Sequence, residues 1–208
     1  MTRKFELEKR VLLESRQVKK FISFLDKKAV PKGGFRRFSI ILWKHAEPEP
    51  DTAASLDFRI RITKKKGLFT LKYGDWRGGG REEYEFYFDV SELASVLNLM
   101  RVLGYKWGTT TYLERGNYKY RGMNVTLDRY LDDGKAVLEI ETVLGSKNQF
   151  KEAEKKIDAI FAEWGLKPFD KADFVEFIRY TNNKKKNYFD FTRGRVEKYI
   201  RLWEKNFK

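Results

Sequence analysis

The stretch FELEKRVLL, residues 5–13, decides the fold because its side chains alternate between two chemical kinds. One parity is apolar except at Lys9, and the other carries charge at Glu6, Glu8 and Arg10. Alternation with a period of two is typical of a β-strand whose two faces meet different surroundings. The pattern therefore predicts a strand that buries one face and directs two glutamates and an arginine from the other.

Later stretches repeat this division between an apolar and a charged face. The charged faces hold Arg59 and Arg61 in LDFRIRI, Lys72 in LFTLKYG, Arg81 in REEYEFYFDV, Asp128 in MNVTLDRY, and Glu139 and Glu141 in AVLEIETV. Strands are predicted at residues 4–13, 56–63, 68–73, 81–90, 123–130 and 135–143, with less regular patterns at 35–44 and 105–121. The chain is therefore predicted to form a largely antiparallel sheet.

A sheet with one solvated face would explain any single strand, but two features of the set favour a closed barrel. The charged faces prefer Arg, Glu and Asp over Thr, Ser and Gln, and the pairs Glu6/Glu8 and Glu139/Glu141 place like charges side by side. Such pairs are unfavourable unless a cation or bases lie between them. We therefore predict an α+β fold, a closed eight-stranded antiparallel β-barrel with a charged lumen and helices packed outside.

Helical periodicity appears between and after the strands. A helix is predicted over 15–28, another from an N-cap at Ser91 to Leu103, and a third from a Ser146/Gln149 capping box to Trp164. Asp170 and Thr192 are predicted to cap two more helices.

The bulk composition is that of a basic globular protein. The chain has 208 residues, 41% of them hydrophobic, a formal net charge of +14 and no cysteine, which excludes disulfides and thiolate metal sites. It has no apolar run long enough to span a membrane, so no membrane partner and a cytoplasmic location are expected. The positive charge predicts attraction to polyanions such as phosphate compounds, nucleotides or nucleic acid.

The segments ELEKR (6–10), RIR (59–61), TLK (70–72), REEYE (81–85), VTLD (125–128) and LEIE (138–141) occur in an order that resembles a known family. The chain resembles the CYTH domain of the triphosphate tunnel metalloenzymes over about residues 3–185. That superfamily includes thiamine triphosphatases, inorganic triphosphatases and class IV adenylyl cyclases. The resemblance implies a triphosphate tunnel domain at residues 1–185 and a C-terminal helical extension at 186–208 packed on it.

Roles for individual residues follow from this resemblance. It implies that Glu6, Glu8, Glu139 and Glu141 bind Mg²⁺ or Mn²⁺, with Glu139 favoured over Glu141 as the direct ligand of the second pair. It implies phosphate binding by Arg10, Arg59, Arg61, Lys72, Arg81 and Arg115, and catalytic roles for Glu8, Arg10 and Asp128. Carboxylates without a cysteine or histidine cluster suit these hard cations independently of the resemblance.

Two residues depart from the family pattern. Arg10 stands where the family usually has lysine, and an arginine cannot become a neutral base near neutral pH. Leu113 replaces a phosphate-binding lysine, so only Arg115 remains of that pair of bases.

The expected function is metal-dependent hydrolysis of a triphosphate compound by a monomer or homodimer. One alternative is an adenylyl cyclase that makes cyclic AMP from ATP. Another is a non-catalytic module that binds polyphosphate, nucleotide or RNA ends, although nucleic acid is not the favoured partner.

Overall fold

A computed structural model describes residues 5–44, 56–63, 66–73, 82–182, 184, 187–190 and 196–207. The strands are β1 (Phe5–Leu13), β2 (Val30–Trp43), β3 (Leu56–Ile62), β4 (Lys66–Tyr73), β5 (Glu82–Asp89), β6 (Trp107–Tyr120), β7 (Met123–Tyr130), β8 (Ala136–Leu144) and β9 (Tyr188–Asp190). The α-helices are α1 (Ser15–Lys28), α2 (Leu93–Val102), α3 (Phe150–Glu163), α4 (Lys171–Asn182) and α5 (Val196–Phe207), and two short 3₁₀ helices, η1 (Val90–Glu92) and η2 (Lys147–Gln149), precede α2 and α3.

The α+β class and the antiparallel sheet are confirmed, with neighbouring strands in the order β1-β8-β7-β6-β2-β3-β4-β5 and β9 beside β6. The pairs β1–β8, β7–β8, β6–β7, β2–β3, β3–β4 and β4–β5 are antiparallel. Within the described residues no ladder joins β1 to β5, so hydrogen bonds do not close the sheet and the predicted closed barrel is not confirmed.

The chain divides into two compact units. The first consists of the described residues within Met1–Phe35 and Leu113–Phe174, and the second of those within Arg36–Asp75, Arg81–Tyr112 and Val175–Lys208. The long strands β2 and β6 contribute residues to both. The predicted boundary after residue 185 stays a prediction.

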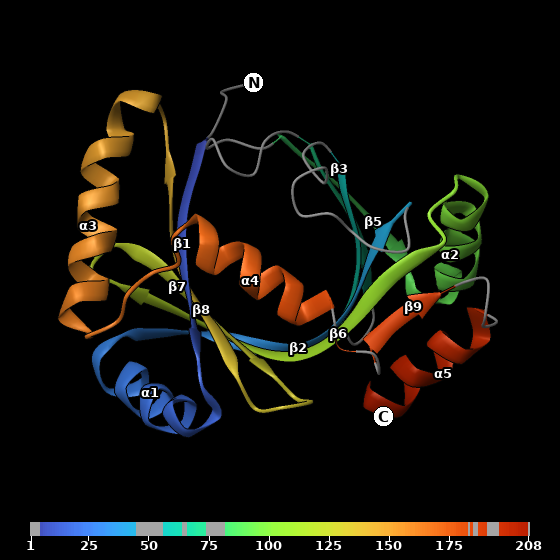
Figure 1. Ribbon diagram of the computed structural model, residues 1–208, viewed down its shortest axis with the longest axis horizontal. Helices are drawn as coiled ribbons and strands as arrows, with labels where there is room; N and C mark the ends of the chain where they lie inside the picture. The colour runs from blue at the N-terminus through green and yellow to red at the C-terminus, as the bar shows by residue number, and fades with distance from the viewer. Residues whose placement is uncertain are drawn as a thin grey trace. The chain divides into compact units, whose positions relative to one another are not determined.

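In the first unit, α1 and α3 cover the apolar face of β1, β7 and β8 (Figure 1). Val11 of β1, Leu127 of β7 and Ile140 of β8 pack with Leu25 of α1 and Phe161 of α3 in one buried cluster. These strand residues belong to the apolar parity of the sequence pattern, so burial of that face sets the register.

Lys9, the charged exception on this face of β1, reaches α3. Its Nζ lies 2.7 Å from Asp158 Oδ1 and 3.0 Å from Glu154 Oε1. Burial alone would lower the pKa of Lys9, but the two carboxylates more than offset this and raise it. The ammonium therefore remains charged beneath a helix.

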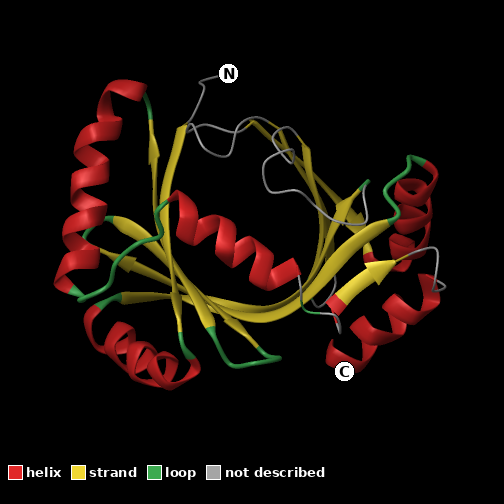
Figure 2. Ribbon diagram, in the orientation of Figure 1, coloured by secondary structure: helices red, strands yellow, loops and turns green. Residues whose placement is uncertain are grey.

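The second unit has its own core on the apolar face of β2, β3 and β4. Ile40, Ile60 and Phe69 pack with Leu97 of α2, and Trp203 of α5 packs against the same cluster. Figure 2 shows α2 and α5 next to each other in this unit, and contacts between these helices confirm the arrangement.

The predicted helix 15–28 is confirmed, and the other helix ends differ slightly from the predictions. Asp89, rather than Ser91, caps the start of η1 by accepting a hydrogen bond from the Ser91 backbone N–H. Gln149 accepts bonds from the backbone N–H groups of Gly145 and Ser146, ahead of α3. The predicted cap at Asp170 is confirmed by its bond from the Asp173 N–H, and Thr192 lies outside the described residues.

Within the described ranges, no helix is long and apolar enough to cross a lipid bilayer.

Candidate functional site

The polar face of the first unit is built from cross-strand rows. In an antiparallel ladder, directly opposite residues share a face. One row therefore runs Glu8, Glu141, Asn124 and Lys119 across β1, β8, β7 and β6. The next row runs Arg10, Glu139, Thr126 and Asn117 across the same strands.

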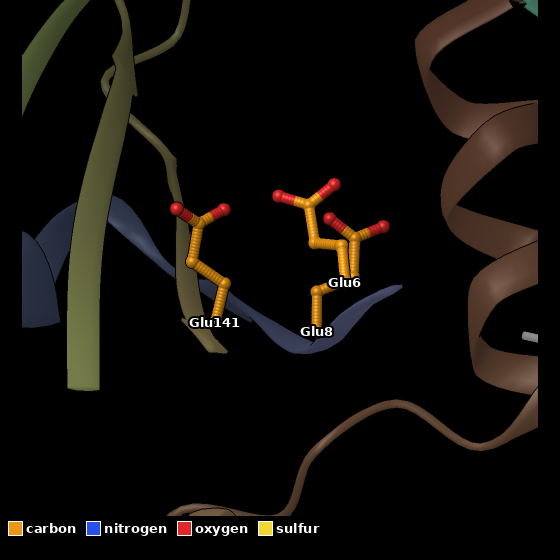
Figure 3. A group of neighbouring side chains, drawn as sticks. All are labelled: Glu6, Glu8 and Glu141. Atoms are coloured by element: carbon orange, nitrogen blue, oxygen red, sulfur yellow. The ribbon is translucent and has the colours of Figure 1, made fainter. Parts of the chain in front are cut away.

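An acidic group lies at one end of this face. One carboxylate oxygen from each of Glu6, Glu8 and Glu141 lies within 4.8 Å of the other two. Figure 3 shows the three side chains rising together, two from β1 and one from neighbouring β8. Carboxylates this close repel one another, so the arrangement favours a cation between them.

Arg10 contacts two glutamates, Glu8 on its own strand and Glu139 on β8. Its Nη2 donates to Glu8 and its Nε donates to Glu139 Oε2 at 2.5 Å. Burial alone would lower the pKa of Arg10, but Glu139 and Glu8 outweigh this effect and raise the pKa further above its ordinary value. Arg10 is therefore a permanent cation, and Glu139 lies against this base while Glu141 joins the acidic group.

The start of α4 covers Arg10 within the first unit. The backbone N–H of Phe169 donates to the Arg10 carbonyl oxygen at 2.7 Å, and the Arg10 guanidinium lies 5.6 Å from the centre of the Phe174 ring. This cation–π contact shields one side of the guanidinium from water and restricts its position.

Arg115 and Asp128 form a two-point pair between β6 and β7. Arg115 Nε donates to Asp128 Oδ1 at 2.6 Å, and Nη2 donates to Oδ2 at 2.5 Å. Burial alone would lower the pKa of Arg115, but Asp128 raises it, with further contributions from Glu139 and Glu141. Asp128 thus orients a guanidinium whose charge is also felt by the glutamates of β8.

The polar face of the second unit presents bases beside an acid, and Arg61 Nη1 lies 3.7 Å from Glu85 Oε1. Arg59 and Arg61 both lie on the β3 face opposite the buried Ile60. Arg61 Nη1 donates to Thr70 Oγ1 at 3.4 Å, and the Thr70 hydroxyl donates to Glu85 Oε1 at 3.4 Å. Of the two other bases expected here, Lys72 is described only as part of β4, without its side chain, and Arg81 lies outside the described residues.

The family profile called CYTH domain matches residues 48–173, more than half of the chain. The chain belongs to the CYTH domain family. No curated protein sequence matches it. The profile match begins after β1, so the acidic residues Glu6 and Glu8 lie outside it, whereas Glu141 lies inside.

Solved structures confirm that the CYTH chain has a recurrent fold. The PH1819 protein from Pyrococcus horikoshii OT3 is 22% identical with a TM-score of 0.63, over 84% of this chain and 98% of that one. HpAC1 from Hippeastrum, described as a candidate adenylyl cyclase with a dominant triphosphatase activity, is 15% identical with a TM-score of 0.51, over 83% and 95%. A chain of the Schizosaccharomyces pombe Mediator head module is 12% identical with a TM-score of 0.53, over 76% and 95%. At these identities the likeness shows the fold alone.

The acidic group of this CYTH chain fits a hard divalent cation. Its donors are carboxylate oxygens only, on two hydrogen-bonded strands, and the chain has no cysteine to compete with them. Mg²⁺ and Mn²⁺ prefer such oxygen ligands. Of the four predicted metal ligands, Glu6, Glu8 and Glu141 come together, and Glu139 bonds Arg10.

Sequence reasoning missed the neutral members of the CYTH polar face. Asn124 and Thr126 stand on the charged parity of β7, four and two residues before Asp128 respectively. Neither side chain is charged, and the family pattern assigns neither of them a functional role. The signal that would have found them is the register that places each beside a glutamate of β8.

Proposed function

We propose that this protein hydrolyses a triphosphate-containing small molecule in a reaction that requires a divalent cation. The observation that carries the proposal is the convergence of Glu6, Glu8 and Glu141 beside a pair of permanently charged arginines, Arg10 and Arg115. Membership of the CYTH family and the triphosphatase activity attributed to HpAC1 support the same reaction class.

Glu6, Glu8 and Glu141 would hold Mg²⁺ or Mn²⁺, whose chemistry is to polarise a phosphoryl oxygen and make a bound water more acidic. Glu139 is assigned to hold Arg10, and it remains available as a further ligand when that guanidinium turns to substrate. This assignment differs from the expectation that Glu139, in preference to Glu141, is the direct ligand of the pair.

The arginines would bind the phosphate chain. A guanidinium can donate two parallel hydrogen bonds to phosphate, and Arg10 and Arg115 are already held in defined positions by carboxylates. Arg59 and Arg61 are assigned the same phosphate-binding role, and so are Lys72 and Arg81 from the family pattern. Charge that develops on the leaving phosphate oxygens would be offset by these bases.

Arg10 cannot remove a proton from water, because its pKa lies above its already high ordinary value. The role proposed for Arg10 is therefore electrostatic, and a carboxylate is left to accept the proton of the attacking water. Glu8 is our candidate for this base.

The test is phosphate release from tripolyphosphate, ATP and thiamine triphosphate, each with Mg²⁺, Mn²⁺ or EDTA. We expect release from at least one substrate with metal and none with EDTA. Cyclic AMP, measured in the same ATP reactions, would instead assign the protein to the cyclase reaction. No product from any substrate, with folded protein, would overturn both enzymatic assignments and favour a binding module.

A further inference from the structure

We propose that Asn124 and Lys119 are positioning residues that orient the Glu141 carboxylate for cation binding. This inference rests on the proposed function, because it assigns a role around the same acidic group. It rests also on two hydrogen bonds that link three adjacent strands. Asn124 Nδ2 donates to Glu141 Oε1 at 3.2 Å, and Lys119 Nζ donates to Asn124 Oδ1 at 3.0 Å.

The direction of this chain of bonds follows from the chemistry of its ends. An ammonium group can only donate, and an ionised carboxylate can only accept. The amide of Asn124 satisfies both neighbours in one orientation, with its oxygen toward Lys119 and its NH₂ toward Glu141. In the reverse orientation the amide oxygen would face a carboxylate, so Lys119 acts on Glu141 by fixing the amide.

The pairing of the strands places these side chains directly opposite one another. Lys119 pairs with Asn124, Asn124 pairs with Glu141, and Glu141 pairs with Glu8 in one continuous row across β6, β7, β8 and β1. Directly opposite side chains in such a row lie about 5 Å apart at their Cβ atoms, within reach of short polar groups. The row therefore ends on the acidic group, and its outer members restrain the innermost glutamate.

This restraint has a chemical purpose at an acidic group. Without a cation, Glu141 is repelled by Glu6 and Glu8 and would turn away from them. A bond from Asn124 to one oxygen holds the side chain in place and leaves the other oxygen for a cation. Outer partners that orient metal ligands in this way typically change metal affinity by about 10- to 100-fold when they are removed.

The first experiment measures Mn²⁺ binding to the full chain by calorimetry, without any substrate. Asn124→Leu keeps the size of the side chain and removes its donor, and we expect about 10- to 100-fold weaker binding. The matched control is Asn98→Leu, the same substitution at an exposed position of α2 in the second unit, which should bind Mn²⁺ as the wild type does. Equal affinity of Asn124→Leu and wild type, or no Mn²⁺ binding by wild type, would overturn the proposal.

The second experiment uses Lys119→Met and gives results of opposite sign for two interpretations. If Lys119 were only a positive charge near the acidic group, its removal would tighten Mn²⁺ binding, because one repulsion is lost. If Lys119 fixes the amide of Asn124, its removal should weaken binding, by about two- to fivefold for an exposed residue. Lys119 is exposed, so the variant should fold even where Asn124→Leu does not.

A combined variant completes the test. In the Asn124→Leu background, Lys119→Met should no longer weaken Mn²⁺ binding, because the amide through which it acts is absent. Independent, additive weakening in the two variants would overturn the positioning role of Lys119. These experiments measure cation affinity, so their outcome is distinct from that of the phosphate-release test. Weaker Mn²⁺ binding by Asn124→Leu would support the positioning role even if no triphosphate is hydrolysed.

Discussion

The two compact units share a construction plan and differ in the charge of their polar faces. Each buries alternate strand residues under helices, α1 and α3 in the first unit and α2 with α5 in the second. The first unit's polar face gathers acids and holds Arg10 and Arg115 against them, whereas the second presents Arg59 and Arg61 from one strand. The comparison teaches that the buried parity of a strand specifies the fold, while the other parity is free to specialise.

The largest expected effect tests the acidic specialisation of the first unit. Glu8→Ala removes one of three converging carboxylates, and we expect metal-dependent turnover to fall by about 1,000-fold or more and Mn²⁺ binding to be lost. Phosphate release and calorimetry measure the two effects. Glu14→Ala, an exposed acid at the start of α1, is the control. Turnover like that of wild type in Glu8→Ala would contradict a role of the acidic group in the reaction.

The next effect tests whether the two cores are equally important to stability. Ile160→Ala in the first unit and Leu97→Ala in the second each empty a nearly fully buried site, at a cost of about 2–5 kcal/mol. Because β2 and β6 run through both units, we expect each variant to shift a single unfolding transition in urea. Two separate transitions, with each variant moving only one, would show that the units unfold independently.

A smaller effect tests the basic specialisation of the second unit. Arg59→Ala should lower kcat/KM for the triphosphate by about 10- to 100-fold, the range for losing a charged hydrogen bond to phosphate. Mn²⁺ affinity should stay within about twofold of wild type. Arg36→Ala removes an exposed base elsewhere in this unit and should have little effect on either measurement. Loss of Mn²⁺ binding in Arg59→Ala would contradict the assignment of Arg59 to phosphate binding alone.

The smallest effect is a pH dependence of stability in the first unit. Burial and the bond to Asp26 raise the pKa of Tyr118 from 10.0 to about 12. Because the folded-state pKa is the higher one, this stabilisation is fully present below pH 10 and is lost as the pH rises toward 12. Urea unfolding at pH 8 to 11 should therefore show a steeper alkaline loss in wild type than in Tyr118→Phe. If stability falls with pH equally in wild type and Tyr118→Phe, the bond between Tyr118 and Asp26 does not contribute to stability.

Sequence alone predicted most of the elements, because strand periodicity is a local property. β7 was predicted with its observed ends, and β1 and β8 within one residue of theirs. Closure of a barrel could not be derived from periodicity, because it depends on pairing between strands far apart in the chain. The short strand β9 was missed, since a three-residue pairing with β6 leaves too little pattern to recognise.

The candidate site was predicted in its charged members and not in its detailed partners. Glu139 contacts Arg10 and Glu141 joins the acidic group because Glu139 lies opposite Arg10 and Glu141 lies opposite Glu8. Only the register of β1 on β8 decides this. The role of Asn124 likewise depends on two neighbouring strands at once. Alternation tells which face a residue occupies, but it does not tell which residues share a row.

The pairing of β1 with β8 also determines when the acidic group can form as the chain is synthesised. Glu8 lies on β1, the first strand along the chain, and its partner Glu141 lies on β8, which is synthesised much later. The acidic group therefore cannot assemble until β8 has been made. At 5–20 residues per second, β1 waits roughly 7 to 27 seconds on the ribosome for its partner. During that interval the nascent chain carries Glu6 and Glu8 without the third carboxylate, so the proposed cation site can form only after most of the chain has been synthesised.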